Sequence, residues 1–253
     1  MSIFGKSNST FGSSSVFGNT NSSSNNMSFG SLGKSVASIN SFGTSTNQTM
    51  TSDATKFVNS NNDTKFSEPP TDTISSLVFS PTTSNIGLAG VSSFCAATCW
   101  DKSIRIWQVD HNSKNTAPKA ETIAAEFPFH CSWNDNSTQL FYASSDKSAY
   151  TWDLASNQSV KFAEHTAPIQ TVHHIKTPTY TAVMTTSWDS TVKFWDLRSA
   201  TPMKSIDIGG KALGADCMYP AAVILNSNRK IAVLNLNNEP SIVRMDDSLL
   251  NHL

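Results

Sequence analysis

Three side chains that could perform chemistry together stand close in the sequence: His165, Ser187 and Asp189. A serine, a histidine and an aspartate can form a hydrolase triad, in which the imidazole accepts the proton of the serine hydroxyl. Ser187 lacks the Gly-x-Ser-x-Gly turn that exposes the nucleophile of α/β-hydrolases. The alternative is structural, because the same side chains can satisfy the indole N–H of Trp195 inside a sheet. We expect this structural role and no catalytic residue.

The structural role requires a chain of hydrogen bonds. Trp195 would donate its indole N–H to the Ser187 hydroxyl on the preceding strand, and the hydroxyl would bond an imidazole. His165 would supply that imidazole, and Asp189 in the following turn would hold it. Each such bond contributes about 1 kcal/mol net, whereas an unpaired buried group costs more. The four residues are therefore expected to specify their part of the fold.

The stretch around Asp189, residues 185–198 (TTSWDSTVKFWDLR), recurs along most of the chain. The recurring feature is an aspartate followed six positions later by a tryptophan. It occurs as Asp101 with Trp107, as Asp146 with Trp152, as Asp189 with Trp195, and in degraded form as Asn228 with Leu234. Successive copies are 45, 43 and 39 residues apart. Such a period, closed by a Trp-Asp pair, is the signature of the WD-repeat β-propeller, in which each blade is a four-stranded antiparallel sheet. The sequence predicts an all-β fold with about four blades.

The strand patterns divide into these four blades. The first blade is expected in residues 72–81, 92–100, 103–109 and 119–127, the second in 129–162, the third in 169–208 and the fourth in 213–244. The first blade has Cys99 at the position of Ser187, and the second offers His130 without a clear match to the imidazole position. The fourth blade has lost the tryptophan, so apolar packing must replace the hydrogen-bond chain there.

Composition divides the chain of 253 residues into two parts. Residues 1–67 consist mainly of Ser, Asn, Thr and Gly, so they are expected to form a disordered tail. Residues 68–253 hold all six tryptophans and form the predicted propeller. The net charge of −1 and the pI of 6.6 give no electrostatic argument for nucleic acid or anionic membranes. Because no apolar run could span a membrane and no secretory signal is visible, we expect a soluble intracellular protein without membrane contact.

Metal and cofactor sites are not indicated by the sequence. No C-x-x-C pair and no phosphate-binding glycine motif is present. The cysteines are Cys95, Cys99, Cys131 and Cys217. We expect them to be buried free thiols rather than ligands.

The tail carries phenylalanines that are each followed by glycine. They are Phe4, Phe11, Phe17, Phe29 and Phe42. Each ring would offer one adhesive group on a solvated chain, which suits many weak and fast contacts. The tail resembles the Phe-Gly repeats of nuclear pore proteins, and that resemblance implies contacts with nuclear transport receptors. The alternative is a low-complexity linker in which the phenylalanines are incidental.

Two further tryptophans, Trp100 and Trp188, directly precede a turn aspartate and so stand at a strand end. Each could be a wedge between blades or an exposed aromatic residue on a binding face. The sequence leaves both interpretations open.

A more specific resemblance follows from the third and fourth blades. The run in residues 166–208, continued by ADCMYPAAV in 215–223, is similar to the WD-repeat messenger-RNA export factors of the nuclear pore, the poly(A) RNA export proteins. The strings ISSLVFSP and AATCWDKSIRIWQV fit the first blade of that family, and the resemblance covers about residues 71–252. It implies a non-catalytic scaffold that docks on a nucleoporin peptide laid across the propeller. It also implies that the protein is located at the nuclear pore complex and can shuttle to the cytoplasm. Messenger RNA or ribonucleoprotein is a further candidate partner. Ubiquitin and tubulin are not indicated.

Two departures from that family bear on function. The family resembled here has seven blades, so four blades lead us to expect an incomplete chain, with a partner's blades or closure of four blades as alternatives. The family also usually lacks a Phe-Gly tail. Two other functions stay open: a spindle-checkpoint-type adaptor that binds kinetochore peptides, and a structural Phe-Gly nucleoporin.

Overall fold

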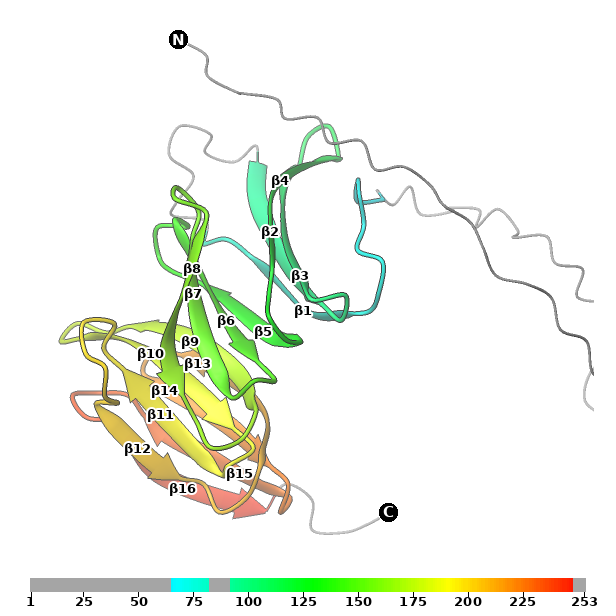
Figure 1. Ribbon diagram of the computed structural model, residues 1–253. Coiled ribbons are helices and arrows are strands. Elements are labelled where there is room, and N and C mark those ends of the chain that lie inside the picture. Colours follow the sequence, from blue (N-terminus) through cyan, green and yellow to red (C-terminus); the bar gives the residue numbers. More distant parts are fainter. Residues whose placement is uncertain (1–64, 82–91, 248–253) are drawn as a thin grey trace, which may run out of the picture. The chain divides into compact units, whose positions relative to one another are not determined.

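The computed structural model of the chain describes residues 65–81 and 92–247. These residues form sixteen β-strands and no helix, arranged as four antiparallel sheets of four strands each (Figure 1). No element of this described part is a helix that could cross a membrane. The predicted all-β fold is confirmed. The five phenylalanines of the tail lie outside the described residues, so their role stays a prediction.

Each sheet is built from strands that are consecutive in the sequence. The first sheet contains β1 (Ile74–Phe79), β2 (Ser92–Cys99), β3 (Ser103–Asp110) and β4 (Asn115–Ile123). The second contains β5 (Pro128–Trp133), β6 (Gln139–Ser144), β7 (Ser148–Asp153) and β8 (Gln158–Glu164). The third contains β9 (Ile169–Lys176), β10 (Thr181–Ser187), β11 (Thr191–Trp195) and β12 (Lys204–Asp207). The fourth contains β13 (Ala212–Met218), β14 (Ala221–Asn226), β15 (Lys230–Asn235) and β16 (Ser241–Asp247). These sheets are the four predicted blades, and the largest difference is that β4 begins earlier than expected.

The turn between the second and third strand of each sheet confirms the alignment of the repeats. The residue after the aligned Asp or Asn has a positive φ in every sheet: 66° at Lys102, 72° at Lys147, 71° at Ser190 and 59° at Arg229. The residue before the aligned Asp or Asn donates its N–H to the segment that enters the sheet, as Trp188 does to the Pro168 carbonyl at 3.0 Å. One tight turn therefore recurs four times, although the side chains around it differ.

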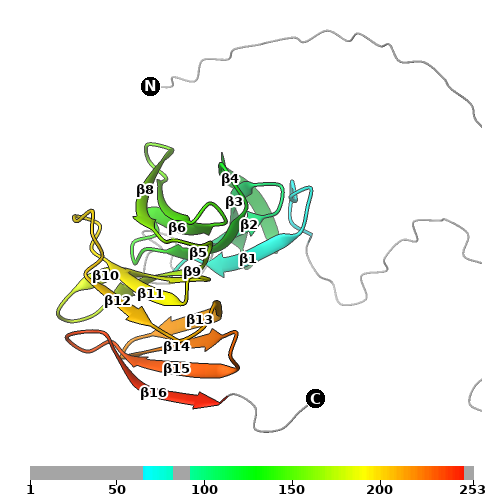
Figure 2. The same ribbon diagram turned by 60° about the horizontal axis from the view of Figure 1, so that its bottom comes forward.

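The sheets bury their faces against one another in sequence order (Figure 2). Ile104 of the first sheet and Leu140 of the second share one apolar cluster. Phe141 shares another with Trp195 of the third sheet. The third and fourth sheets meet in a cluster that contains Leu234. The first strands of neighbouring sheets, β1, β5, β9 and β13, lie next to each other.

The first and fourth sheets present apolar side chains to solvent. Leu77 and Phe79 on β1 are each 51% exposed, and Met218 at the end of β13 is 82% exposed. On β14 of the fourth sheet buried and exposed residues alternate, with Val223 39% and Leu225 46% exposed, as expected for a period of two.

Candidate functional sites: a buried polar network and an aromatic row

The side chains that the sequence singled out for chemistry meet inside the third sheet. His165 Nδ1 lies 2.9 Å from Asp189 Oδ2, and its Nε2 lies 2.8 Å from Thr185 Oγ1. The indole N–H of Trp195 donates to the same Thr185 oxygen at 2.8 Å. The ionised Asp189 carboxylate can only accept, so the neutral imidazole of His165 carries its proton on Nδ1, and its Nε2 accepts from the Thr185 hydroxyl, which in turn accepts from Trp195. We call these four residues the third-sheet network.

The hydroxyl of this network is not that of Ser187. The predicted hydrogen bond from the Trp195 indole N–H to the Ser187 hydroxyl was wrong. Ser187 Oγ lies 3.0 Å from the Ala167 carbonyl and 2.9 Å from the Pro168 carbonyl, to which it donates. It also accepts the N–H of Asp189 at 3.1 Å. Ser187 therefore fastens the turn to the segment that enters the sheet.

The register of the strands explains the choice of hydroxyl. Trp195 on β11 lies opposite Val183 on β10, so Thr185 is its diagonal neighbour, within reach of a long aromatic side chain. Ser187 lies two residues further along, past Thr186, which pairs with Val192 of β11. Six-residue spacing in the sequence could not separate these two hydroxyls.

Electrostatics in the network keep the aspartate charged and the histidine neutral. Burial lowers the pKa of His165 below its usual value, and the nearby Asp189 charge opposes this only in part. Burial raises the pKa of Asp189, but it is outweighed by hydrogen bonds from Thr191 and Thr166 and by the charge of His165, which together hold that pKa well below its usual range. Since His165 is mostly neutral near pH 7, the threonine bonds are the cause that acts there.

The geometry does not assemble a hydrolase triad. Ser187 donates to backbone carbonyls, whereas His165 bonds the hydroxyl of Thr185, which has no exposed surface. A nucleophile must be reachable by its substrate. The network therefore joins the strands and the turn.

In the first sheet the tryptophan indole N–H has a different acceptor. Ala97 occupies the position that corresponds to Thr185, and Trp107 donates its indole N–H to the Ser67 carbonyl at 2.7 Å. The Phe66 ring packs edge to face on Trp107 at 5.3 Å. Asp101 keeps its turn role, because hydrogen bonds from the Ser103 and Thr71 side chains and backbone N–H groups outweigh burial and lower its pKa to about 2. Phe66 and Ser67, which the sequence assigns to the tail, thus contact this sheet.

The second sheet uses yet another arrangement. Trp152 donates to the Asn157 side chain at 2.9 Å, and Asp146 accepts the Tyr150 hydroxyl at 2.5 Å. Ala124, rather than a histidine, stands at the position equivalent to His165. Its N–H donates to the Lys102 carbonyl in the turn of the first sheet, as the N–H of His165 donates to the Lys147 carbonyl in the turn of the second.

A second feature, on the side of the sheets that carries these turns, is a row of aromatic rings. Trp100 lies 5.4 Å from Phe127 and 6.0 Å from Phe129 between ring centroids, and Phe129 stacks on Trp188 at 5.8 Å. Trp100 belongs to the turn between β2 and β3, Phe129 to β5, and Trp188 to the turn between β10 and β11. We call these four residues the aromatic row, which crosses three sheets.

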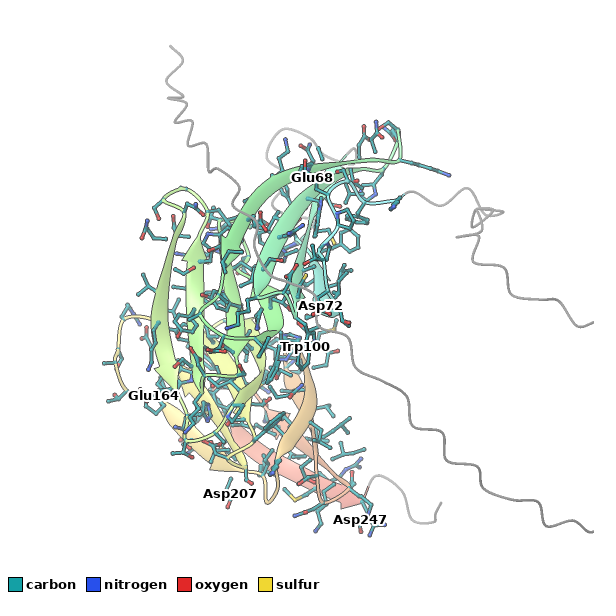
Figure 3. All side chains as sticks on the ribbon, turned by 45° about the vertical axis from the view of Figure 1, so that its right-hand side comes forward. Glu68, Asp72, Trp100, Glu164, Asp207 and Asp247 are labelled. Carbon is teal, nitrogen blue, oxygen red and sulfur yellow. The ribbon has the colours of Figure 1, made fainter. Side chains whose placement is uncertain are left out.

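The aromatic row is both packed and accessible. Trp100 is 45% exposed although it contacts the second sheet, and Figure 3 shows it at the end of the first sheet that carries Asp72. Trp188 is half-buried and donates its indole N–H to the Gln170 side chain at 2.9 Å. Both interpretations that the sequence left open are therefore compatible with the geometry. The sequence reasoning missed Phe127 and Phe129, although their two-residue spacing at a strand start points both rings the same way.

Comparisons with known proteins agree with the repeat. The family model described as WD domain, G-beta repeat, matches residues 63–108 and 156–196. The chain therefore contains WD repeats. The predicted resemblance to messenger-RNA export factors is also confirmed by similar proteins. One is "Protein Rae1" of Drosophila melanogaster, 38% identical over 199 residues, which cover 79% of this chain and 56% of the relative. Others are "mRNA export factor" of Xenopus tropicalis, 41% identical over 211 residues (83% and 55%), and of Danio rerio, 38% identical over 190 residues (75% and 50%). The chain spans about half the length of these curated relatives.

The cysteines of this WD-repeat protein are thiols. Burial raises the pKa of Cys95 to about 11 and is also the main cause that raises the pKa of Cys131 to about 12, so both stay protonated near pH 7. Within residues 65–81 and 92–247, no group of three or more His, Cys, Asp or Glu side chains is placed to hold a metal ion.

Proposed function

We propose that this WD-repeat protein is a non-catalytic scaffold in messenger-RNA export that acts at the nuclear pore complex and docks on a nucleoporin peptide through the aromatic row. Its similarity to proteins named mRNA export factor supports the process. The observation that carries the docking mode is the aromatic row, because it offers accessible rings on three consecutive sheets.

The chemistry of the aromatic row favours an extended, apolar peptide. Burying an aromatic or aliphatic side chain contributes roughly 1.5–3 kcal/mol, and tryptophans are frequent hot spots of interfaces. Trp100 has almost half of its surface available for such burial. The Lys102 ammonium lies 5.2 Å from the Phe127 ring centre and is paired with Glu126 at 3.1 Å, so it adds no unpaired charge beside the row. A peptide laid along the row would therefore place apolar side chains on the rings.

The tail would have a separate role. Its five Phe-Gly dipeptides would contact nuclear transport receptors, while the sheets hold the protein at the pore. Messenger RNA or ribonucleoprotein would be brought in through these partners. The protein would reside in the nucleus and at the nuclear envelope.

The docking mode is tested by Trp100→Ala in the full chain, expressed in its native cell. We expect loss of the nuclear-rim signal and nuclear accumulation of poly(A) RNA, with only a modest fall in the urea midpoint, because the ring also packs on Phe127 and Phe129. Tyr219→Ala is the matched control, because Tyr219 is 41% exposed and lies in the turn between β13 and β14, away from the row. A normal rim signal for Trp100→Ala would contradict docking through the row.

The role of the tail is tested by deletion of residues 1–64. The deletion should end there because Phe66 and Ser67 contact Trp107. If rim localisation survives and receptor binding is lost, the sheets provide targeting as proposed. If localisation is lost instead, the structural Phe-Gly nucleoporin is favoured, and a kinetochore signal would favour the checkpoint adaptor.

A further inference from the structure

A hydroxyl side chain directly precedes a proline at three places in the chain: Ser80-Pro81, Thr177-Pro178 and Thr201-Pro202. Proline-directed kinases phosphorylate such a hydroxyl, because the pocket that receives the next residue has no acceptor for an N–H, and proline has none to donate. Some of these kinases also select a basic residue three positions after the hydroxyl, which pairs with an acidic group of the kinase. Residues 1–64 contain no proline, so the tail offers no such place.

Two of the three hydroxyls are buried and already hydrogen-bonded. Ser80 is 5% exposed, and its Oγ accepts the N–H of Phe94 at 3.1 Å. Thr177 is 8% exposed, and its Oγ1 donates to the Tyr180 carbonyl at 3.0 Å and accepts the N–H of Tyr180 at 2.9 Å. Three positions after these hydroxyls the chain has Thr83 and Tyr180, neither of which is basic. In the folded chain both hydroxyls are therefore closed to a kinase.

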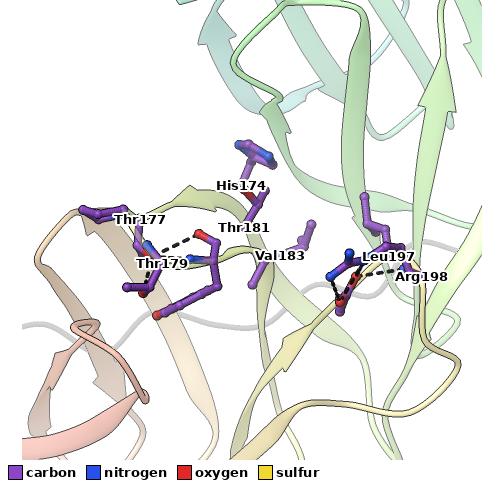
Figure 4. Close-up of a pocket in the computed structure, with 11 residues that line it drawn as sticks. His174, Thr177, Thr179, Thr181, Val183, Leu197 and Arg198 are labelled. Atoms are coloured by element: carbon purple, nitrogen blue, oxygen red, sulfur yellow. Dashed lines mark hydrogen bonds and ion pairs between the residues drawn. The ribbon is translucent and has the colours of Figure 1, made fainter.

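Thr201 differs from these two because it lies in an exposed loop. The loop consists of residues 196–203, between β11 and β12, and residues 197–201 are all exposed. Figure 4 shows Leu197 and Arg198 at the start of this loop, apart from the turn that contains Thr177. The Thr201 hydroxyl lies 3.2 Å from the Ser199 hydroxyl, which belongs to the same loop. A phosphate on Thr201 would therefore displace an exposed neighbour and not a buried one.

The basic residue that such a kinase selects is Lys204, three positions after Thr201. Lys204 begins β12, the outermost strand in the order β12-β11-β10-β9, so a kinase can approach it from the edge of the sheet. Its ammonium is paired with Glu239 at 2.6 Å, and the two side chains are 38% and 74% exposed. Exposed ion pairs are weak, so a carboxylate of the kinase can take the place of Glu239.

We propose that Thr201 is a phosphorylation site for a proline-directed serine/threonine kinase that also selects Lys204. The Thr201 hydroxyl oxygen forms a bond to the γ-phosphorus of ATP held by the kinase, the bond from that phosphorus to its bridging oxygen breaks, and ADP leaves. The hydroxyl proton passes to the catalytic aspartate of the kinase. The product carries a charge of about −1.5 to −2 near pH 7.

The phosphorylated loop would be separate from the aromatic row. The loop follows the end of β11, whereas Trp188 lies in the turn before the start of the same strand. The added charge would therefore lie at the opposite end of the third sheet, and the proposal does not depend on docking through the row.

The test incubates the full chain with ATP, Mg²⁺ and a purified cyclin-dependent kinase, a class that selects both the proline and the basic residue, and locates the phosphate by mass spectrometry. We expect phosphate on Thr201 and about tenfold less or none on Ser80 and Thr177, because their hydroxyls become accessible only when the structure opens locally. Thr201→Ala should remove the main signal. Its urea midpoint should equal that of the native chain, since Thr201 is exposed.

Two matched variants separate selection by the kinase from the ion pair. Lys204→Ala and Glu239→Ala both break the pair between these residues, but only Lys204→Ala removes the cation. We expect Lys204→Ala to lower the initial rate of phosphorylation by about tenfold or more. Glu239→Ala should leave the rate equal or raise it, because it frees the ammonium. Trp100→Ala should leave the rate unchanged, so this proposal and the docking proposal can fail separately.

Three results would overturn the proposal. The first is the lack of phosphate on Thr201 in the folded chain, and phosphorylation of a synthetic peptide of residues 197–208 would then show that the loop is closed to the kinase. The second is equal labelling of Thr177 or Ser80. The third is an equal rate for Lys204→Ala and Glu239→Ala, which would show that the kinase does not select Lys204.

Discussion

The third and fourth sheets contain the same turn in the same register, yet different interactions hold them together. In the third sheet a buried polar network joins Trp195 through Thr185 to His165 and Asp189. In the fourth sheet the position of Trp195 is taken by Leu234, which is fully buried in the cluster between the two sheets. One sheet relies on hydrogen bonds that all need partners, and the other relies on apolar contact.

In the turn of the fourth sheet the side-chain bonds to the turn backbone come from Asn226, at the position of Ser187, and not from the aligned residue Asn228. The Asn226 side chain donates to the Ile208 carbonyl at 2.6 Å and accepts the N–H groups of Asn228 and Lys230, each at 3.0 Å. Arg229 keeps the positive φ that follows the aligned residue. The turn therefore forms without an imidazole. The WD signature combines the turn with a hydrogen-bonded tryptophan, and the fourth sheet has the turn alone.

The largest expected effect comes from the apolar sheet. Leu234→Ala should lower the free energy of unfolding by roughly 2–5 kcal/mol, because it leaves a cavity in a packed cluster. Urea unfolding monitored by tryptophan fluorescence measures this. Val223→Ala is the control, since Val223 is 39% exposed on the same sheet and should cost much less. Equal losses for the two variants would show that the cluster does not hold the fourth sheet.

Next comes the polar sheet, tested by Thr185→Val. The change keeps the shape but removes the hydroxyl that Trp195 and His165 share, and an unpaired buried group costs roughly 1–3 kcal/mol. The free energy of unfolding should fall by at least that amount in urea titrations. Trp195→Phe should cost less in this background than in the native chain, because the indole N–H has already lost its acceptor and only the lost packing remains. Full additivity of the two changes would mean that the network is not formed.

The sequence was sufficient for the repeat, and it fell short at the hydrogen bonds. Spacing predicted the four sheets and the turn residues Asp101, Asp146, Asp189 and Asn228, because the turn geometry needs a short polar side chain at that position. Thr185 and Ser187 are equally plausible from spacing, since two residues apart on a strand means the same face. The pairing of Trp195 with Val183 decides between them, because it makes Thr185 the diagonal neighbour and leaves Ser187 two residues further away.

The aromatic row shows a different limit of the sequence. Trp100 and Trp188 are far apart in the chain, and the sequence shows each only as a tryptophan at a strand end. In the structure Phe129 contacts both rings, across two sheet boundaries. Contacts between repeats depend on how the sheets pack on each other, and no single repeat contains that information.

The stability of the boundary between the third and fourth sheets is expected to depend on pH. His173 on β9 is bonded to the backbone of Ala215 in the fourth sheet, and burial, followed by the nearby His130, lowers its pKa to about 3 despite Asp216. An unfolded histidine titrates near 6.5. Below that pH the unfolded chain binds the proton that native His173 refuses, so stability falls as the pH drops from about 6.5 toward 3.

The measurement that isolates this contribution is urea unfolding at pH 6 and pH 5 for the native chain and for His173→Phe. The native chain should lose up to about 1.4 kcal/mol more than the variant over this pH unit. Phenylalanine fits because His173 Nε2 is buried without a hydrogen-bond partner, so the variant leaves only the Ala215 bond unmade. Identical pH slopes for the two proteins would show that His173 is already protonated in the folded state.

The smallest expected effect comes from the same substitution, threonine to valine, at a position outside the third-sheet network. Thr151 on β7 has a buried hydroxyl without a hydrogen-bond partner. Thr151→Val should therefore be neutral or stabilise the protein by up to about 1 kcal/mol, since it removes a polar group that is already unpaired. The same substitution then has opposite consequences in two sheets, and the partners of the hydroxyl are the cause. If Thr151→Val cost as much as Thr185→Val, the loss at Thr185 would reflect the loss of threonine packing and not the polar network.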